Sequence, residues 1–381
     1  MIFYGKQFLD NEEVNAVKKV LKSEFITQGP KSREFEQNLK NRFKSKYCLA
    51  LSSGTAALHL AGKALGWKKN DLVLTTPITF LATLNSIIYN NASPVLVDIN
   101  KYTLNIDLNL LEDKIISLKK KNKKIKSVIG VDFSGSPCEW KEIKFLSKKY
   151  NFTTINDNCH AIGAKYLNDI GYAVKYADIV THSYHPVKNI TTGEGGALFT
   201  NNKNFYEKIK NLNSHGVIKG KNWNFKLTDI GFNYRLNEIS SAIGISQLKK
   251  LNNFLKKRRI IAKNYDNFFQ KFNNVKTPYK NKNFKSAYHL YTLSFDFKKN
   301  KINKSNFFNF MKKHGFSLQV HYVPLFFHKI YKNYLKFSLS KYTNSITYYD
   351  QSFSIPIYPS LKKSDQDKLK LLIKKYLHLK C

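Results

Sequence analysis

Short apolar stretches alternate with helical stretches through the first half of this 381-residue chain. The strand candidates are residues 72–75, 94–98, 127–132, 153–156, 179–182 and 197–200. Strands separated by helices are joined through crossover connections, which makes their sheet mostly parallel and covers both of its faces with helices. We therefore expect an α/β fold built on an open, mostly parallel central sheet.

The pattern changes in the last third of the chain. Residues 237–269 are apolar at helical spacing in their first half and strongly basic in their second half, which predicts one long helix. Beyond that helix, residues 287–295 and 318–322 are strand candidates that flank a helix over 305–314. These elements predict a smaller α+β domain at the C-terminal end.

Three parts are expected from this order of elements. They are a large domain over residues 1–245, a connecting long helix over 246–269 and a small C-terminal domain over 270–381. The large domain should begin with a helix over residues 10–23, for which Asp10 is a suitable N-cap.

Lys188 stands in a loop of small and turn-forming residues between two strand candidates. It follows Ser183 by five positions and precedes the pair Gly195-Gly196. A lysine that forms a Schiff base with an aldehyde cofactor must be held rigidly and kept largely out of water, so that its amine is partly neutral. In a chain with 64 Lys and Arg residues this spacing is weak alone, and it gains meaning from the upstream motifs.

The small residues Ser52-Ser53-Gly54-Thr55 open an Ala- and Leu-rich helical stretch. A helix N-terminus presents free N–H groups and the positive end of the helix dipole, and it therefore binds phosphate. Gly54 would let the backbone approach closely, and Thr55 would add a hydroxyl donor. An ordinary serine N-cap is the alternative interpretation.

Asp157 ends a strand candidate, and His160 follows three positions later. In open α/β sheets, ligands bind beyond the carboxyl ends of the strands. An acid there can keep the pyridine nitrogen of pyridoxal phosphate (PLP) protonated, and His160 would reach the phenolic oxygen of the same ring. A surface aspartate that begins a turn, with a histidine of the core, is the alternative.

Phe80 follows another strand candidate, and its ring could stack on a flat cofactor. The chain has 28 Phe residues, so a single Phe is more often part of the core. Phe80 becomes a candidate cofactor-binding residue only because all these motifs follow one another in this order along the chain.

In this order, the motifs resemble those of the sugar-nucleotide aminotransferases of the DegT/DnrJ/EryC1/StrS family, which have the fold type I architecture of PLP-dependent enzymes. The resemblance runs from the first ten residues nearly to the end of the chain. The stretches that resemble most closely the branch of pseudaminic acid biosynthesis are residues 26–30, 183–196, 213–216, 231–238 and 319–324. One departure is Asn158-Cys159, where small residues are more usual in the family.

The resemblance implies a role for each matching position. Lys188 would be the catalytic Schiff-base lysine, and Asp157 would be the partner of the pyridinium nitrogen. The cofactor-binding residues would be Gly54, Thr55, Phe80, Asp157, His160, Ser183, Lys188 and, from the neighbouring subunit, Asn233. The residues bordering the sugar nucleotide would be Tyr4, Glu24, Phe25, Ile26, Thr27, Asn233, His321, Tyr322, Val323 and Pro324.

The resemblance also implies the reaction. A homodimer with shared active sites would convert a UDP-4-keto-6-deoxy-N-acetylhexosamine into its 4-amino sugar, with L-glutamate as amino donor. A related branch has a histidine in place of the lysine and performs dehydration, so Lys188 favours transamination. The alternatives are a transaminase for another nucleotide-linked 4-keto sugar (a UDP-D-sugar, or a TDP- or GDP-sugar) and, more distantly, a non-enzymatic basic binding protein.

Charge and cysteine content indicate the surroundings of the protein. The formal net charge is +38, yet only five of the 64 basic residues are Arg, which nucleic-acid surfaces favour for its bidentate geometry. The lysines are spread along the whole chain, and no apolar run approaches 18 residues, so we expect neither a nucleic-acid nor a membrane partner. The four Cys residues show no metal-binding or redox spacing, which fits a cytoplasmic enzyme without a metal.

Overall fold

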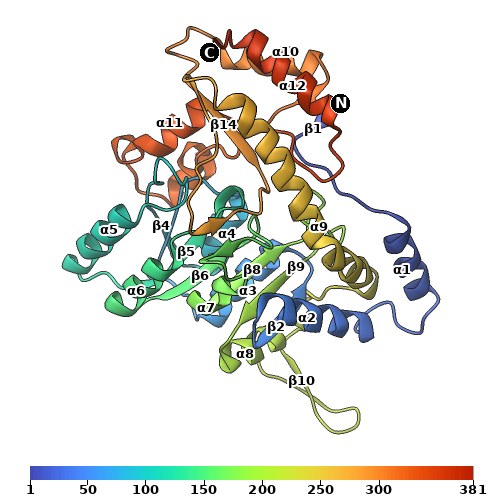
Figure 1. Cartoon of the computed structure of the whole chain (residues 1–381). Coiled ribbons are helices and arrows are strands. Elements are labelled where there is room, and N and C mark those ends of the chain that lie inside the picture. The colour runs from blue at the N-terminus through green and yellow to red at the C-terminus, as the bar shows by residue number, and fades with distance from the viewer. Residues whose placement is uncertain (381) are drawn as a thin grey trace.

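The computed structural model describes residues 1–380 and is organised around a seven-stranded sheet in the order β2–β9–β8–β6–β5–β3–β4 (Figure 1). β9 is antiparallel to β2 and β8, and the other neighbouring pairs are parallel. The strands are β2 (Tyr47–Leu51), β3 (Leu72–Thr75), β4 (Ser93–Leu96), β5 (Ile125–Val131), β6 (Thr153–Asp157), β8 (Ile179–Ser183) and β9 (Gly196–Thr200). The expected mostly parallel α/β sheet is thus confirmed.

Alternate residues of the strands point into two different cores, one on each face of the sheet. In β2, for example, Cys48 and Ala50 belong to one core, whereas Leu49 and Leu51 belong to the other. The first core is covered by α2 (Pro30–Phe43), α5 (Leu108–Lys120), α6 (Trp140–Tyr150), α7 (Tyr172–Tyr176) and the first half of α9. The second is covered by α3 (Gly54–Ala64), α4 (Leu81–Tyr89) and α8 (Lys203–Asn213).

The N-terminal segment begins with a short strand and continues into a capped helix. β1 (Ile2–Phe3) pairs in parallel with β15 (Phe316–Ser317), and α1 spans Asn11–Leu21. Asp10 caps α1 in a capping box with Glu13, as the sequence predicted for this position. Because β1 pairs with a strand from the C-terminal part, the two ends of the chain meet in the same region of the molecule.

α9 (Glu238–Phe269) is one continuous helix of 32 residues, which makes it about 48 Å long. Asn237 caps it by accepting a hydrogen bond from the Ser240 amide at 2.8 Å. Its second half packs into a separate C-terminal core. That core contains the antiparallel sheet β12 (Val275–Lys276), β14 (Tyr291–Phe295) and β16 (Ser352–Ile355), with α10 (Lys304–Lys313) and α12 (Lys363–Tyr376). The domain limits 1–245, 246–269 and 270–381 remain predictions.

Two of the predicted C-terminal strands differ from the structure. Residues 318–322 do not form a strand, apart from an isolated bridge between Gln319 and Ser354, because β16 takes the place beside β14. The strand expected over 287–295 begins only at Tyr291, because the backbone before it is hydrogen-bonded to another loop: the Ala287 amide donates to the Gly135 carbonyl at 2.9 Å. Both irregular segments run past the cavity described below.

Short elements complete the chain, and one of them extends away from the body. The hairpin of β10 (Val217–Lys219) and β11 (Phe225–Leu227) projects beyond α8 at the bottom of Figure 1. The others are β7 (Lys165–Tyr166), β13 (Phe284–Lys285), α11 (Thr343–Gln351) and the 3₁₀ turns Phe133–Gly135, Leu325–Phe327, Lys329–Asn333 and Leu339–Lys341.

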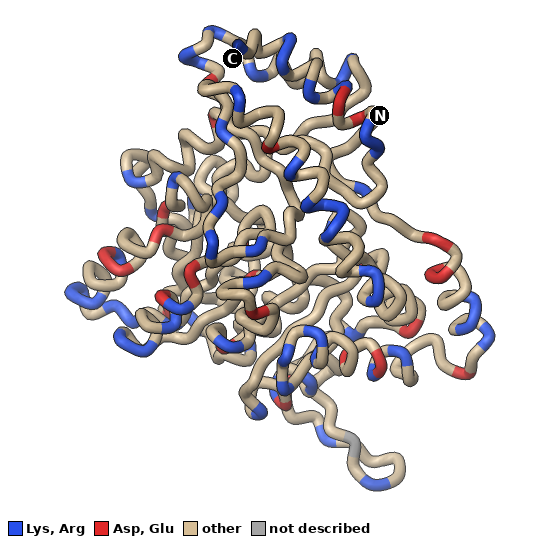
Figure 2. Tube along the Cα trace, in the orientation of Figure 1, with Lys and Arg blue, Asp and Glu red and all other residues tan. Residues whose placement is uncertain are grey.

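The basic residues are distributed over the molecule rather than gathered on one element. Figure 2 shows Lys and Arg on the helices of both ends of the chain and around the central sheet. Within residues 1–380, none of the helices combines the length and the apolar character needed to cross a bilayer.

Candidate active site

A cavity of about 360 Å³ lies at the carboxyl ends of β5, β6 and β8. Sites for small molecules typically have volumes of roughly 300–1,000 Å³. Ten residues that the sequence predicted border this cavity: Tyr4, Gly54, Thr55, Phe80, Asp157, His160, Ser183, Lys188, His321 and Tyr322. Segments from both ends of the chain thus meet around one space.

The strand ends explain why these residues meet. Asp157 is the last residue of β6 and Ser183 the last residue of β8, and these two strands are parallel neighbours. Parallel neighbours end at the same edge of a sheet, where the chain leaves for its crossover. Lys188 follows in the loop that connects β8 to β9 and reaches the same edge.

The N-terminus of α3 forms one wall of the cavity. The Ser53 hydroxyl caps the helix by accepting from the Ala56 amide at 3.0 Å. A Cβ atom at Gly54 would lie 2.8 Å from the Ser183 Cβ, so only glycine fits between helix and strand. The capping serine and the free helix end are therefore both present, and the two interpretations of this motif do not exclude each other.

The Lys188 side chain is only partly exposed and borders the cavity beside Asp157 and Cys159. Burial lowers the pKa of the Lys188 amine, and the neighbouring Cys159 and Asp157 oppose part of that shift. A lowered pKa leaves more of the amine neutral, which a nucleophilic lysine requires.

Asp157 is buried, and its carboxylate is held by two donors. The Thr83 hydroxyl donates to Oδ2 at 2.7 Å, and the Cys159 amide donates to Oδ1 at 3.3 Å. Both oxygens are therefore oriented, and the carboxylate still faces the cavity.

His160 carries its proton on the nitrogen that faces Tyr322. Its Nδ1 accepts from the Ser134 amide at 3.3 Å, so in the neutral ring Nε2 is protonated and donates to the Tyr322 hydroxyl at 3.0 Å. Burial lowers the pKa of His160 well below the ordinary range, with smaller contributions from Lys188 and His321. This tautomer is inferred from the hydrogen-bond network.

Tyr4 and His321 form the wall of the cavity that lies nearest the N-terminal segment. The rings of Tyr4 and His321 meet edge to face with centroids 4.5 Å apart. His321 Nδ1 lies 2.9 Å from the Ser354 hydroxyl, and burial lowers the pKa of His321 to about 3. The His321 imidazole is therefore neutral at physiological pH.

Seven predicted residues do not border the cavity of this single chain: Glu24, Phe25, Ile26, Thr27, Asn233, Val323 and Pro324. Asn233 instead forms an isolated bridge with Ser214 at the base of the β10–β11 hairpin. Phe25 and Ile26 are exposed on the surface. For these positions the sequence-based roles remain predictions.

The cavity also includes residues that the sequence did not single out, notably Thr83 and His289. The His289 ring lies 4.3 Å from that of His160, and its Nδ1 is buried without a partner among the described residues. Thr79, which precedes α4, and Thr83, in the first turn of α4, are four positions apart, and their hydroxyls are 2.8 Å apart. That spacing was a usable signal, whereas His289 lay inside a stretch interpreted as strand.

A mostly parallel sheet with one antiparallel strand, β9, and a lysine in the loop that precedes this strand defines the class of fold type I PLP-dependent enzymes. Residues 7–372 match the DegT/DnrJ/EryC1/StrS aminotransferase family. This chain therefore belongs to that family, whose aminotransferases depend on PLP.

Three known proteins illustrate the relationship. The UDP-4-amino-4,6-dideoxy-N-acetyl-beta-L-altrosamine transaminase of Campylobacter jejuni is 39% identical over 370 residues, which cover 96% of this chain and 94% of that protein. Helicobacter pylori PseC, an aminotransferase involved in the biosynthesis of pseudoaminic acid, has a structure with a TM-score of 0.92, 31% identity and 99% coverage of both chains. The PLP form of the sugar aminotransferase Spr1654 from Streptococcus pneumoniae has a TM-score of 0.88, 25% identity and 98% coverage of both chains.

The residues of the cavity are compatible with PLP in size and in chemistry. Gly54 lets the N-terminus of α3 pack directly against Ser183 at the end of β8, so that the helix end borders the cavity. Asp157 offers an acceptor for a ring nitrogen, and Lys188 offers an amine of lowered pKa for an aldehyde. Ser183 and Thr55 add hydroxyl donors near the helix end.

Proposed function

We propose that this protein transfers an amino group from L-glutamate to C4 of a UDP-4-keto-6-deoxy-N-acetylhexosamine, in pseudaminic acid biosynthesis. The observation that carries this proposal is the meeting of Lys188, Asp157 and the N-terminus of α3 around one cavity. The substrate class is supported by full-length similarity to relatives named for that sugar and that pathway.

PLP, when bound, would supply an aldehyde that reacts with amines and a ring that withdraws electrons from the carbon next to the amine. Lys188 would hold the cofactor through its amine, and the N–H groups at the start of α3, with Thr55 and Ser183, would bind the phosphate. Asp157 would keep a proton on the ring nitrogen, and Thr83 orients its carboxylate for that role.

The proton transfer would be carried out by Lys188. Once its amine is free, the amine would accept a proton from the Cα of the amino donor as a general base. The same group would then deliver that proton, as a general acid, to the C4′ carbon of the cofactor. Its lowered pKa suits both roles, because a proton carrier works best with a pKa near the working pH.

The sugar nucleotide would lie against the wall formed by Tyr4, His321 and Tyr322. Neutral His321 and Tyr322 present hydrogen-bonding groups without a charge, which suits the hydroxyl and keto groups of a sugar. The anionic diphosphate would be attracted by the positive net charge of the protein.

A homodimer with shared sites is part of the proposal. The β10–β11 hairpin projects from the body, and Trp223, Phe225 and Ile230 on and beside it are exposed, Trp223 by 89%. Such apolar side chains are normally covered by a partner surface. A second copy would cover them and would bring Asn233 to the neighbouring cavity. Glu24 to Thr27 would border the sugar nucleotide.

The proposed location is the cytoplasm. Among the described residues, Cys48, Cys138 and Cys159 are all free thiols. Unpaired cysteines are usual where the surroundings are reducing.

A substrate panel tests the proposed function. Purified protein would be incubated with glutamate and one of several keto sugars: UDP-4-keto-6-deoxy-N-acetylhexosamines of the L and D series, and TDP- and GDP-4-keto sugars. Mass spectrometry would measure amine formation, and NMR would assign the configuration at C4 and C5. Turnover only with another nucleotide sugar would refute the proposed substrate, but the protein would still be an aminotransferase.

Absorbance tests the class of protein separately from the substrate. The protein with PLP should show a visible band that disappears when glutamate is added. A colourless protein that binds nucleic acid in a salt-dependent manner would instead support the basic binding protein.

A further inference from the structure

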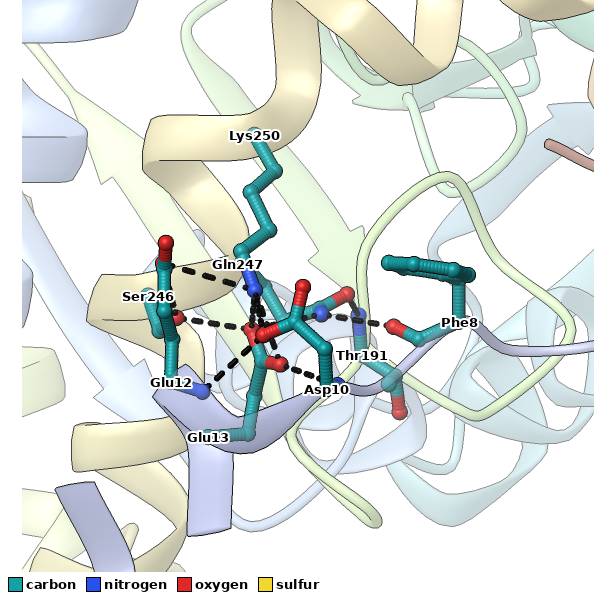
Figure 3. A network of polar contacts seen from close by, with 8 residues as sticks. All are labelled: Phe8, Asp10, Glu12, Glu13, Thr191, Ser246, Gln247 and Lys250. Carbon is teal, nitrogen blue, oxygen red and sulfur yellow. Dashed lines mark hydrogen bonds and ion pairs between the residues drawn. The ribbon is translucent and has the colours of Figure 1, made fainter. Parts of the chain in front are cut away.

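A buried polar network connects α1 and α9 to the loop that carries Lys188 (Figure 3). We infer that Gln247 is a positioning residue for the Lys188 loop, and that the Glu13–Lys250 ion pair holds the Gln247 amide in the required orientation. The inference rests on the proposed function for its catalytic consequence, but its structural part is independent of the reaction.

The centre of the network is the Glu13 carboxylate, which is 2% exposed. Lys250 contacts both of its oxygens, at 2.8 and 2.9 Å. The Ser246 hydroxyl donates to Oε1 at 2.7 Å, and the Asp10 amide donates to Oε2 at 2.9 Å. A buried charge needs this number of partners, because an unpaired carboxylate in the interior would be strongly destabilising.

The surroundings of Glu13 favour the ionised form of its carboxylate, as an ion pair with Lys250 requires. Burial raises the pKa of Glu13, but the hydrogen bond from Lys250 and the other donors more than compensate, so that the pKa lies below its ordinary value. The carboxylate is therefore ionised at physiological pH. Asp10 is 2.6 Å from the same Lys250 amine and adds a second, exposed acidic partner.

Two acceptors determine which way the Gln247 amide points. Its Nε2 donates to the Phe8 carbonyl at 2.8 Å and to Glu13 Oε1 at 3.0 Å. An amide nitrogen is a donor only, so these two acceptors leave Oε1 on the opposite side. There Oε1 accepts from the Thr191 amide at 3.4 Å. An inverted amide would place its oxygen against the carboxylate and the carbonyl.

Thr191 is the point at which this network reaches the Lys188 loop. The Thr191 hydroxyl donates to the Tyr184 carbonyl at 2.9 Å and accepts from the Gly193 amide at 3.0 Å, so Thr191 closes the loop on both sides of the lysine. The Thr191 residue is itself buried. Gln247 thus supports the backbone three residues after Lys188.

The N-terminal segment is attached to the same loop by packing. A Cβ atom on Gly5 would lie 3.3 Å from the Val187 Cβ, which places the segment directly on the residue before Lys188. The preceding Tyr4 borders the cavity, and the Phe8 carbonyl binds Gln247. Through these contacts, the anchor at Glu13 fixes both Tyr4 and the Lys188 loop.

The first test is hydrogen exchange of the cofactor-free protein, measured by mass spectrometry on a peptide that contains Thr191. Gln247→Met keeps the size of the side chain but removes the acceptor, and exchange at Thr191 should become about tenfold faster. Glu13→Gln leaves the size of the carboxyl group and removes the charge that orients Gln247, so a smaller increase, about threefold, is expected.

Asp266→Asn is the matched control. Asp266 is a buried carboxylate on the same helix, 2.7 Å from the Lys280 amine and 2.8 Å from the hydroxyl of Tyr291, which belongs to the C-terminal core, so neither partner is part of the network around Gln247. This variant should lower the melting temperature without changing exchange at Thr191. Unchanged exchange at Thr191 in both Gln247→Met and Glu13→Gln, or an equal change in Asp266→Asn, would overturn the inference.

Activity gives the catalytic readout. In Gln247→Met, kcat should fall about tenfold. This fall should be larger than the fall in kcat of Asp266→Asn, even where the two variants have the same melting temperature. A normal kcat with fast exchange at Thr191 would refute the positioning role. An inactive parent protein with the expected exchange pattern would count against the proposed function and leave the network intact.

Discussion

The hydroxyl of Thr83 donates a hydrogen bond to a carboxylate oxygen of Asp157 across 2.7 Å, and both residues are buried. The same hydroxyl lies 2.8 Å from that of Thr79, so a short chain of hydroxyls leads from α4 to the strand end. Since Asp157 faces the cavity, Thr83 determines how the carboxylate is presented to a ligand.

Replacing Thr83 tests that relationship. Thr83→Val keeps the shape and removes the donor, and hydrogen bonds to charged groups are worth about 1.5–3 kcal/mol, so kcat should fall by roughly ten- to a hundredfold. Thr83→Ser keeps the hydroxyl and should remain within about threefold of the parent. Steady-state kinetics with saturating substrates measure both, and equal rates for the Val and Ser variants would contradict the assigned role.

Lys188→Ala should abolish turnover and leave the fold intact, because the amine is the group that would carry the proton. Borohydride reduction of the parent protein with PLP, followed by peptide mapping, should place the label on Lys188. The exposed Lys203 is a suitable control, and Lys203→Ala should retain activity and labelling. A label on another lysine would remove Lys188 from the reaction.

Glu36 makes stability depend on pH. Burial raises its pKa to about 7 from an ordinary 4.5, while a hydrogen bond from the Ala50 amide at 2.9 Å opposes part of that shift. Between these two values the folded protein keeps a proton that the unfolded chain has released. The unfolded state then binds fewer protons, so stability falls as pH rises through this window.

Glu36→Gln should remove that loss. A neutral amide can still accept from the Ala50 amide, so the free energy of unfolding at about pH 8 should rise by about 1–3 kcal/mol, with little change at about pH 4. Urea denaturation at the two pH values measures the difference. An equal effect at both pH values would mean that packing, not the ionisation of Glu36, is responsible.

The sequence predicted the parts of this protein in which local pattern and tertiary structure agree. Apolar runs identified the strands of the central sheet, because buried parallel strands are apolar on both faces. Asp157 and Lys188 were identified because strand ends and turn-rich loops carry recognisable residues. The Asp10 cap belongs to the same group, since capping depends on neighbours in sequence.

What the sequence did not predict depends on contacts between distant segments. Residues 318–322 resemble a strand, but they lie beside the cavity while Ser352–Ile355 pairs with β14. Gln247 lies on the inner face of a long helix, and no local pattern indicates that its amide reaches Thr191, 56 positions away. Thr83 and His289 are similar, because each contacts a predicted site residue that is distant in sequence: Thr83 contacts Asp157, and His289 contacts His160.

The last prediction concerns the shared site. Asn233 lies at the base of the projecting hairpin and outside the cavity of its own chain, where it bridges to Ser214. If it serves the neighbouring subunit, Asn233→Ala should lower activity, although Lys188 of the same chain is unchanged. The alternative is that Asn233 only stabilises the turn that precedes α9.

Hybrid dimers separate these two interpretations. When Lys188→Ala and Asn233→Ala chains are co-expressed with different tags and the hybrid is purified, one of its two sites carries both changes and the other carries neither. The hybrid should therefore recover up to about half of the parent activity per dimer, since one complete site remains. Size-exclusion chromatography would establish the dimer, and each singly mutated homodimer is the control. If Asn233 acts within its own chain, the hybrid combines one site lacking Lys188 with one lacking Asn233, and no activity above that of the Asn233→Ala homodimer would appear.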